Sequence, residues 1–383
     1  MTLDELMDYG RLLRFAWEST KQSRWKGTSQ RYLANALLKN LELREDVMQG
    51  TYRVSPTIDF TLNERGHIRR IEAPVVRDRI VQKPLSVQLL IPTIRPHLIY
   101  DNYASLEGRG TSMARRRFCT MLSKYYRKYG RNGYVLLIDV SKYFENINHD
   151  VLKQILAPQI SGHSDEVIRL IHYIIDTSSK TEHGLNLGSE NPQIFAVEYL
   201  HRIDHYCKVV RRIKYYLRYM DDIAIFCTSK AEAMQLKADI AEQLATLKLE
   251  INDKKTQIVR LSHKFVWLQT KYTLTETGYI VKQPTRAKLV RERRRLKAHR
   301  RLVSKRRMST YEAWCAYKSW RGSIVADYNA CYGALKRMDA LFWQLFHIIT
   351  FPIKENRLMV WNNILSNAET SDIRNTLLFN KLN

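Results

Sequence analysis

The sequence lacks any long apolar run. No stretch of about 18 consecutive apolar residues occurs in its 383 residues, so no membrane-spanning helix and no membrane partner are expected. The N-terminus, MTLDELMDYG, has neither the basic region nor the apolar core of a secretion signal. The five cysteines include no CxxC pair, which argues against a zinc site and a disulfide framework. We therefore expect a cytoplasmic protein in a reducing compartment.

Acidic residues are in short supply. The chain has 38 Asp and Glu against 63 Lys and Arg, which gives a net charge of +25. Basic groups placed against phosphates release condensed counterions, so this balance favours a nucleic-acid partner. A ribosome-associated or merely soluble basic protein is the alternative. The hydrophobic fraction of 45% is large enough to form a sizeable core.

The apolar spacing indicates a mixture of helices and short strands, without internal repeats. Helices are expected over 3–45, 76–97, 113–129, 164–177, 192–211 and 230–247. Extended segments are expected over 52–73, 134–140, 214–226 and 265–282. A strongly basic helix is expected over 286–307, where Leu289, Leu296 and Val303 form an apolar stripe. We expect a lobe boundary near 275–285.

Carboxylates stand at two strand ends. Asp221 and Asp222 lie between the strand-like runs KYYLR and IAIF, and Asp139 ends the apolar run YVLLID. Buried carboxylates are costly without a cation. If these strands are neighbours, the three side chains converge and suit Mg²⁺, two ions of which catalyse phosphoryl transfer. An ordinary polar hairpin turn is the alternative for Asp221-Asp222.

These motifs resemble those of reverse transcriptases. Tyr219-Met220-Asp221-Asp222 is similar to the family's YMDD signature, and residues 138–144 (IDVSKYF) are similar to the block that carries its first catalytic Asp. The resemblance implies that Asp139, Asp221 and Asp222 are catalytic and bind two Mg²⁺ ions, with Mn²⁺ as an alternative, and that Val140 belongs to the metal site. It also implies that Phe144 is a steric gate that favours deoxynucleotides. A plain core aromatic is the other interpretation of Phe144.

Further blocks occur in family order over about 50–275. The resemblance assigns Arg69, in the segment GHIRRIEAP, to the incoming triphosphate, and Arg109, in YASLEGRGT, to nucleic acid. Gln193 follows the Gly184–Gly188 loop near the nucleotide, and Lys255 is assigned to protonation of the leaving pyrophosphate. Solvated surface side chains are the alternative for Arg69 and Lys255. On the basic helix, the nucleic-acid contacts are expected to be Arg291, Arg294, Arg295, Lys297 and Arg301.

The resemblance implies an α+β right-hand polymerase, with fingers, a palm of antiparallel sheet backed by helices, and a helical thumb. We expect an N-terminal helical extension over 1–49, fingers and palm over 50–275, and a basic helical thumb with the C-terminal region over 276–383. The implied activity is RNA-directed DNA synthesis from deoxynucleotides. No RNase H-like acidic set or His/Cys nuclease cluster follows residue 285.

The loop before Gln193 reads Asn186-Leu187-Gly188 instead of Pro-Gln-Gly. In this it resembles bacterial defence-associated and diversity-generating enzymes of the group II intron-like superfamily. We expect cDNA synthesis from a dedicated structured non-coding RNA in antiphage defence, because Ser189–Pro192 departs from the hypermutation lineage. Mutagenic retrohoming and a non-catalytic RNA-binding scaffold are the alternatives. Template, primer, fidelity and oligomeric state stay open.

Overall fold

The computed structural model describes residues 1–64, 67–186 and 188–346, and side chains 63–69 are outside the description. The chain divides into two compact units, Met1–Thr285 and Arg286–Asn383, each of which is treated separately below. The elements combine helices with antiparallel sheets, which confirms the predicted α+β class. None of the described helices is both long and apolar enough to cross a lipid bilayer.

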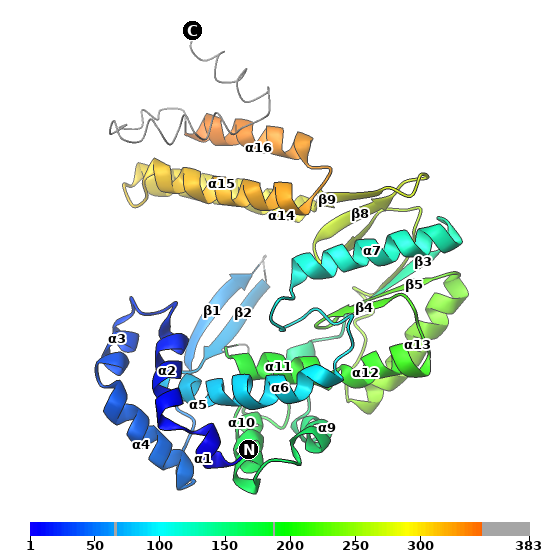
Figure 1. Cartoon of the computed structure of the whole chain (residues 1–383). Helices are drawn as coiled ribbons and strands as arrows, with labels where there is room; N and C mark the ends of the chain where they lie inside the picture. The colour runs from blue at the N-terminus through cyan, green and yellow to red at the C-terminus, as the bar shows by residue number, and fades with distance from the viewer. Residues whose placement is uncertain (65–66, 187, 347–383) are drawn as a thin grey trace. The chain divides into compact units, whose positions relative to one another are not determined.

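The first unit begins with four helices and a β-hairpin (Figure 1). The helices are α1 (Leu3–Leu6), α2 (Tyr9–Thr20), α3 (Gly27–Ala34) and α4 (Ala36–Met48). They are followed by β1 (Ile58–Glu64) and β2 (His67–Ala73), which pair in an antiparallel register from Ile58 opposite Ala73. Next comes a helical segment made of α5 (Val76–Pro84), η1 (Leu85–Leu90), α6 (Ile91–Ile94) and η2 (Arg95–His97).

A four-stranded antiparallel sheet is the centre of this unit, with the strand order β4-β5-β3-β6. Its strands are β3 (Tyr134–Ile138), β4 (Tyr216–Tyr219), β5 (Asp222–Cys227) and β6 (Gln257–Arg260). Side chains alternate between two faces, because successive residues of a strand point to opposite sides. The predicted strand–turn–strand over 214–226 is the β4–β5 hairpin.

Helix α7 (Thr111–Tyr129) covers one face of this sheet, and helix α13 (Lys230–Thr246) lies on the other side (Figure 1). On the α7 face, Val135, Leu137, Ala224 and Phe226 belong to a cluster with Phe118 of α7. On the α13 face, the alternate residues belong to a second cluster. Its buried sheet members are Leu136, Ile138, Tyr216, Ile223, Ile225 and Cys227, and its α13 members are Ala233, Leu236, Ile240 and Leu244.

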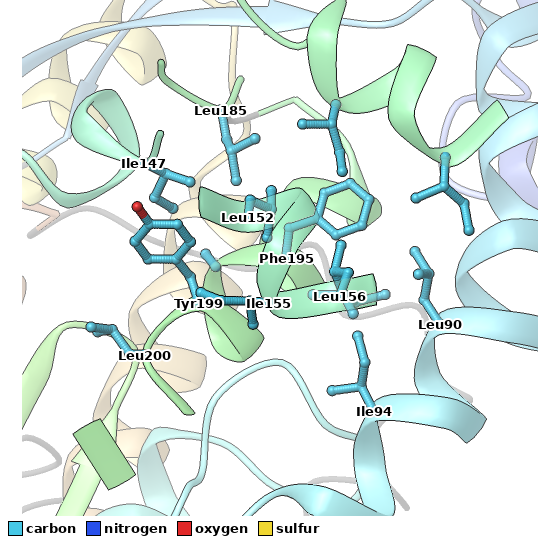
Figure 2. Close-up of a cluster of buried hydrophobic side chains, with 14 of the residues drawn as sticks. Leu90, Ile94, Ile147, Leu152, Ile155, Leu156, Leu185, Phe195, Tyr199 and Leu200 are labelled. Carbon is cyan, nitrogen blue, oxygen red and sulfur yellow. The ribbon is translucent and has the colours of Figure 1, made fainter. Parts of the chain in front are cut away.

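The larger cluster continues among the helices next to the sheet. These helices are α8 (Tyr143–Asn146), α9 (His149–Ile160), α10 (Asp165–Asp176), α11 (Glu190–Tyr199), α12 (His201–His205) and η3 (Tyr206–Val210). Figure 2 shows Phe195 of α11 packed among Leu152, Leu156 and Leu185. This apolar packing fixes α11 and α12 against the sheet, so polar groups on these helices can hold the strands.

A three-stranded sheet completes the first unit, with the order β7-β8-β9. Its strands are β7 (Phe265–Trp267), β8 (Thr270–Leu274) and β9 (Ile280–Pro284). The Phe118 ring stacks on Trp267 with 4.8 Å between centroids, and this contact joins the small sheet to α7.

The second unit is helical over its described residues. It contains α14 (Arg286–Ser304), α15 (Thr310–Asp327) and α16 (Tyr332–Leu345). Leu296 of α14, Tyr317 of α15 and Phe342 of α16 are buried together. Leu296 is thus the centre of the predicted apolar stripe. Residues 347–383, part of the predicted C-terminal region, lie outside the described residues.

Three elements were missed from the sequence, and one of them is the four-residue helix α8. Helix α9 was not predicted, although Asn148 caps it by accepting from the Val151 amide and its apolar residues recur at helical spacing. Strand β6 was also missed, because its four residues, QIVR, alternate too briefly to give a pattern.

Candidate active site

The turn between β4 and β5 is a two-residue hairpin loop formed by Met220 and Asp221. Tyr219 and Asp222 make the last register pair before the turn. Met220 has a φ of +56°, a conformation that favours glycine at the first position of such a loop. Met220 nevertheless packs its side chain against the apolar core. The turn is therefore held in a costly conformation by its surroundings.

Asp139 and Asp222 stand at the same end of neighbouring strands. Ile138 and Ile223 are opposite each other in the β3–β5 register, and the two acids follow them at that end. Asp139 is two residues after Leu137, and Asp222 is two residues before Ala224, both of which face α7. Alternation therefore places both carboxylates toward that same face. The structure brings together two carboxylates that are 83 positions apart in the sequence.

Asp221 acts electrostatically on the block that carries Asp139. Burial raises the pKa of the Tyr143 hydroxyl well above its usual value, with Arg218 opposing this and Asp221 adding to it. Tyr143 follows Asp139 by four positions and belongs to the same sequence block. On the strand, burial and then Asp222 raise the pKa of Tyr219, which keeps that phenol neutral.

Asp139 is held by the segment after α13. Asn252 donates from Nδ2 to Asp139 Oδ2 at 3.0 Å, and the Nζ of Lys255 is 3.2 Å from the same oxygen. The main-chain amide of Asn252 donates to the carbonyl of Asp139 at 2.8 Å. The side chain of Asp139 is 18% exposed and that of Lys255 is 65% exposed. Such an open ion pair adds little stability, so its importance is the charge that it places beside the carboxylate.

Val140 and Phe144 follow Asp139 closely. The Val140 side chain is buried in the core, so only its main chain can take part in a metal site. Its backbone pairs with Ile251 in an isolated antiparallel bridge. Phe144 is half-buried on α8, packs partly on the core and lies edge-on to Tyr143 at 5.6 Å. A partly exposed ring that also packs on the core is compatible with both roles expected for Phe144, a steric gate and a core aromatic.

Gln193 and Arg109 come from different segments that meet. Gln193 is exposed on α11 and accepts a hydrogen bond from the Ser105 hydroxyl at 3.3 Å. Arg109 donates to the carbonyl oxygens of Tyr100, at 2.8 Å, and Asn102. Its guanidinium also lies over the Tyr103 ring. Arg109 thus braces its own loop, and its contact with nucleic acid stays a prediction.

Gly188 makes a close backbone approach to the end of β2. A Cβ on Gly188 would be 2.1 Å from the carbonyl oxygen of Glu72 and 2.7 Å from the Cα of Ala73. Only glycine allows this contact. The glycine loop therefore packs on the hairpin that carries Arg69, whose backbone pairs with Leu62. The Arg69 side chain and Leu187 lie outside the described residues.

The cations predicted on α14 divide into two groups. Arg291, Arg294, Lys297 and Arg301 are exposed. Arg295 instead donates from one terminal nitrogen to Glu292 at 2.8 Å and to the carbonyl of Ala316 at 3.1 Å. Arg295 therefore helps to join α14 to α15, unlike its four exposed neighbours.

The donor set around Asp139 fits a hard divalent cation. Carboxylate and carbonyl oxygens are the ligands that Mg²⁺ prefers. Asp139 and Asp222 supply carboxylates at one sheet end, and Val140 supplies a main-chain carbonyl. Over residues 1–64, 67–186 and 188–346, no three or more His, Cys, Asp or Glu side chains are grouped so that they hold a metal ion.

Sequence reasoning missed Arg218, which is fully buried one position before Tyr219. It forms an ion pair with the buried Asp204 of α12. A signal was present, because a charged residue inside an apolar strand requires a partner. Its partner was not evident, since Asp204 is 14 positions earlier on a helix.

Three comparisons with known proteins bear on this site. The family model described as reverse transcriptase (RNA-dependent DNA polymerase) matches residues 61–280. No curated protein matches the chain. Among solved structures, apo telomerase from Candida tropicalis truncated from its C-terminal domain has a TM-score of 0.45 and 14% identity, and covers 65% of this chain and 60% of that chain.

Two further telomerase structures are similar at the same level. Apo telomerase from Candida tropicalis has a TM-score of 0.48 and 14% identity, and covers 85% of this chain and 66% of that one. Telomerase from Candida albicans, in complex with a TWJ fragment of telomeric RNA, has a TM-score of 0.49 and 10% identity, with 86% and 62% covered. The chain thus spans 60 to 66% of these telomerase chains. Likeness at this level carries no functional argument.

Proposed function

Because this chain belongs to the reverse transcriptase family, we propose that it is an RNA-directed DNA polymerase that adds deoxynucleotides to a growing strand. One observation carries the proposal. Asp139 and Asp222 lie next to the paired residues Ile138 and Ile223 and share one face of the sheet. Asp221 is in the adjoining turn. A catalytic reverse transcriptase needs carboxylates in this arrangement.

We propose that Asp139, Asp221 and Asp222 bind two Mg²⁺ ions, assisted by the main-chain carbonyl of Val140, with Mn²⁺ as a substitute. Bound ions supply electrostatic stabilisation of the charge that develops on the attacking and leaving oxygens. Asn252 orients the Asp139 carboxylate by donating to Oδ2. Lys255 places an ammonium group beside that carboxylate, where it can hold a proton for the leaving pyrophosphate.

Nucleotide selection is assigned to side chains around this sheet end. Phe144 is partly exposed five positions after Asp139, and its ring excludes a ribose 2′-hydroxyl in this proposal. Gln193 and Arg69 are proposed to contact the incoming nucleotide. Support for Gln193 is its exposure next to Ser105, at the junction of two sequence blocks.

The nucleic-acid partners are proposed to be an RNA template and the DNA product. The exposed cations of α14 are charged groups suitable for backbone phosphates. The template proposed is a dedicated structured non-coding RNA, and the setting is antiphage defence in the bacterial cytoplasm. Mutagenic retrohoming is the alternative, and the neighbouring genes separate the two: a repeat-flanked variable gene supports mutagenesis, and a non-coding RNA gene supports defence.

The test is incorporation of labelled deoxynucleotides by the purified protein on its co-purified RNA. We expect Asp139→Asn, and the double change Asp221→Ala/Asp222→Ala, to abolish incorporation while RNA affinity is retained. Asp253→Asn is the matched control, because Asp253 is a 79% exposed carboxylate of the same segment and contacts Lys237. RNA binding without incorporation by the wild type indicates a non-catalytic scaffold, and incorporation by Asp139→Asn disproves the assignment.

A further inference from the structure

Arg218 is a fully buried cation directly behind the catalytic turn. It lies on β4, one position before Tyr219, and is among the largest fully buried side chains of the protein. An uncompensated buried charge costs several kcal/mol. The hydrogen-bond partners of the Arg218 side chain therefore indicate which function compensates for this cost.

The guanidinium of Arg218 forks onto Asp204. Its Nε donates to Asp204 Oδ1 at 2.7 Å, and Nη2 donates to Oδ2 at 2.5 Å. The Tyr216 hydroxyl donates to the same carboxylate at 2.6 Å. Asp204 is itself fully buried on α12. Such a two-point contact fixes the orientation of the guanidinium plane.

The remaining donors of Arg218 reach the turn and a second helix. Nη1 donates to the carbonyl oxygen of Met220 at 3.0 Å, and Nη2 donates to the carbonyl oxygen of Val197 on α11 at 3.0 Å. The Arg218 main chain bonds the loop before α7, through Asp101 and Tyr103. One residue thus connects the catalytic turn to α11, α12 and a loop.

The bond to Met220 acts on the residue with the costly backbone conformation. Arg218 faces the opposite side of the sheet from Asp222, because Tyr216, two positions earlier on β4, belongs to the cluster opposite α7. We propose that Arg218 and Asp204 are positioning residues, which hold the Met220 carbonyl from behind and so orient Asp221 and Asp222 for metal binding. This inference rests on the proposed function and deepens it.

The test compares Arg218→Lys with Tyr216→Phe. Lysine keeps the positive charge, but its single ammonium group cannot form the two-point contact with Asp204 and also donate to the Met220 carbonyl. Tyr216→Phe is the matched control, because it removes one bond to Asp204 and leaves every Arg218 contact. We expect Arg218→Lys to lower kcat by about 10- to 100-fold, since small misplacements of reacting groups cost this much. Mn²⁺ affinity, measured by electron paramagnetic resonance, should fall as well.

The KM for deoxynucleotide and the RNA affinity of Arg218→Lys should stay near wild type, and Tyr216→Phe should resemble wild type throughout. If Arg218→Lys does not fold by circular dichroism, Asp204→Asn decides by the same measurements. A folded variant with unchanged kcat and Mn²⁺ affinity, altered only in melting temperature, overturns the proposal. The absence of incorporation by the wild type refutes the proposed function instead, while the Mn²⁺ titration still tests the positioning pair.

A second surface, independent of the active site, lies at the junction of α2 and α3. Trp17 is 50% exposed and Trp25 is 76% exposed. Arg24 lies over the Trp17 ring at 5.0 Å, and Lys26 lies over the Trp25 ring at 5.4 Å. We call these four residues, together with the exposed Lys21, the tryptophan surface.

Hydrogen bonds fix the end of α2 and the turn that follows it. Thr20 donates to the carbonyl of Ala16 at 2.7 Å, and the hydroxyls of Ser23 and Ser29 are 3.0 Å apart. The surrounding segment 11–31 has six basic residues and only one acid, Glu18. Exposed rings beside cations suit unpaired bases and their phosphates.

We infer that the tryptophan surface binds a single-stranded stretch of RNA. The choice of RNA as the nucleic acid rests on the proposed function. The test is affinity of the full chain for a labelled single-stranded RNA and for an RNA duplex of the same length. Trp17→Ala/Trp25→Ala should weaken single-strand binding by at least about fivefold, the lower limit for losing one stacked base. Leu37→Ala is the control, because Leu37 is 66% exposed on nearby α4.

Duplex affinity should be unchanged in the tryptophan variant. Unchanged single-strand affinity, or an equal loss on duplex, disproves the inference. Single-stranded DNA of the same sequence shows whether ribose is recognised. These measurements need no nucleotide incorporation, so their outcome is separate from that of the polymerase test.

Discussion

The Nζ of Lys255 is 3.2 Å from Oδ2 of Asp139, although the two residues are 116 positions apart. The contact arises because the backbone around Asn252 pairs with that of Asp139 and Val140. Folding thus makes Lys255 a neighbour of Asp139, the first of the three carboxylates proposed to be catalytic.

Changing Lys255 should affect the chemistry more than the binding. We expect Lys255→Met to lower the single-turnover incorporation rate by roughly 100-fold, the usual effect of removing a general acid. Removal of the cation also leaves Asp139 without a competing charge, so half-maximal activity should need less Mg²⁺. Rapid-quench kinetics over a Mg²⁺ series measures both effects. Lys254→Met, at the adjacent exposed position, is the control and should change neither. An unaltered rate in Lys255→Met removes its proposed role.

Phe144 should control the sugar of the product strand. Phe144→Val shortens the side chain but keeps an apolar group against the core, and we expect ribonucleotide incorporation to rise by roughly tenfold or more relative to deoxynucleotide incorporation. The measurement is the ratio of kcat/KM values for the two nucleotides. Phe144→Tyr keeps the ring and should keep the selectivity. A Phe144→Val enzyme that is equally selective, with a lower melting temperature, shows that the ring serves only in packing.

Glu198 should make stability depend on pH. Burial raises its pKa to about 8, with Arg218 opposing this and Asp204 adding to it. Gln159 donates to Oε1, while the buried Oε2 has no hydrogen-bond partner among the described residues. The folded state then holds a proton that the unfolded state has lost, so stability should fall as pH rises from near 4.5 to about 8. Below that range the carboxyl is protonated in both states.

Glu198→Gln removes this titration and keeps an acceptor for Gln159. Thermal melting is measured at pH 5, 6, 7 and 8. The melting temperature of the wild type should fall more steeply with pH than that of the variant, because both proteins share every other titratable group. Glu166→Gln, which changes an exposed carboxylate on α10, should leave the wild-type slope nearly unaltered. Parallel slopes for wild type and Glu198→Gln would contradict the prediction.

Gly188 should not accept even alanine. Its added Cβ would meet the main chain of Glu72 and Ala73, and main-chain atoms cannot move aside as a flexible side chain can. We expect Gly188→Ala to lower the free energy of unfolding by about 1–3 kcal/mol. It should also raise the KM for deoxynucleotide, because the loop precedes Gln193. Gly162→Ala is the control, since nothing lies within 4 Å of its added Cβ. Chemical denaturation and steady-state kinetics give both values.

Much of the fold could be predicted from apolar spacing. The helix at 230–246 and the hairpin around Met220-Asp221 match their predicted positions closely. Helix α9 also has helical spacing but was overlooked, whereas strand β6 could not be assigned in this way. β6 is short and half-buried, and it forms because the edge of β3 offers unpaired backbone groups, which is a property of the partner strand.

The candidate site was predictable where the chemistry lies in residue type. A carboxylate at the end of an apolar run is visible in a sequence, and Asp139, Asp221 and Asp222 were found in this way. The contacts made by the candidate arginines were not visible. Arg109 and Arg295 were equivalent to any other arginine until the structure placed their guanidinium groups on carbonyl oxygens of their own unit.

The sequence by itself determined which carboxylates are candidates for the proposed metal site, because an acidic residue at the end of an apolar run can be read directly. It also determined the hairpin, because a short loop between two apolar strands is a local property. Only the tertiary structure decided that Lys255 contacts Asp139 and that Arg218 holds Met220 while paired with Asp204. Contacts of this kind depend on strand register and helix packing over long sequence separations, for which no local pattern exists.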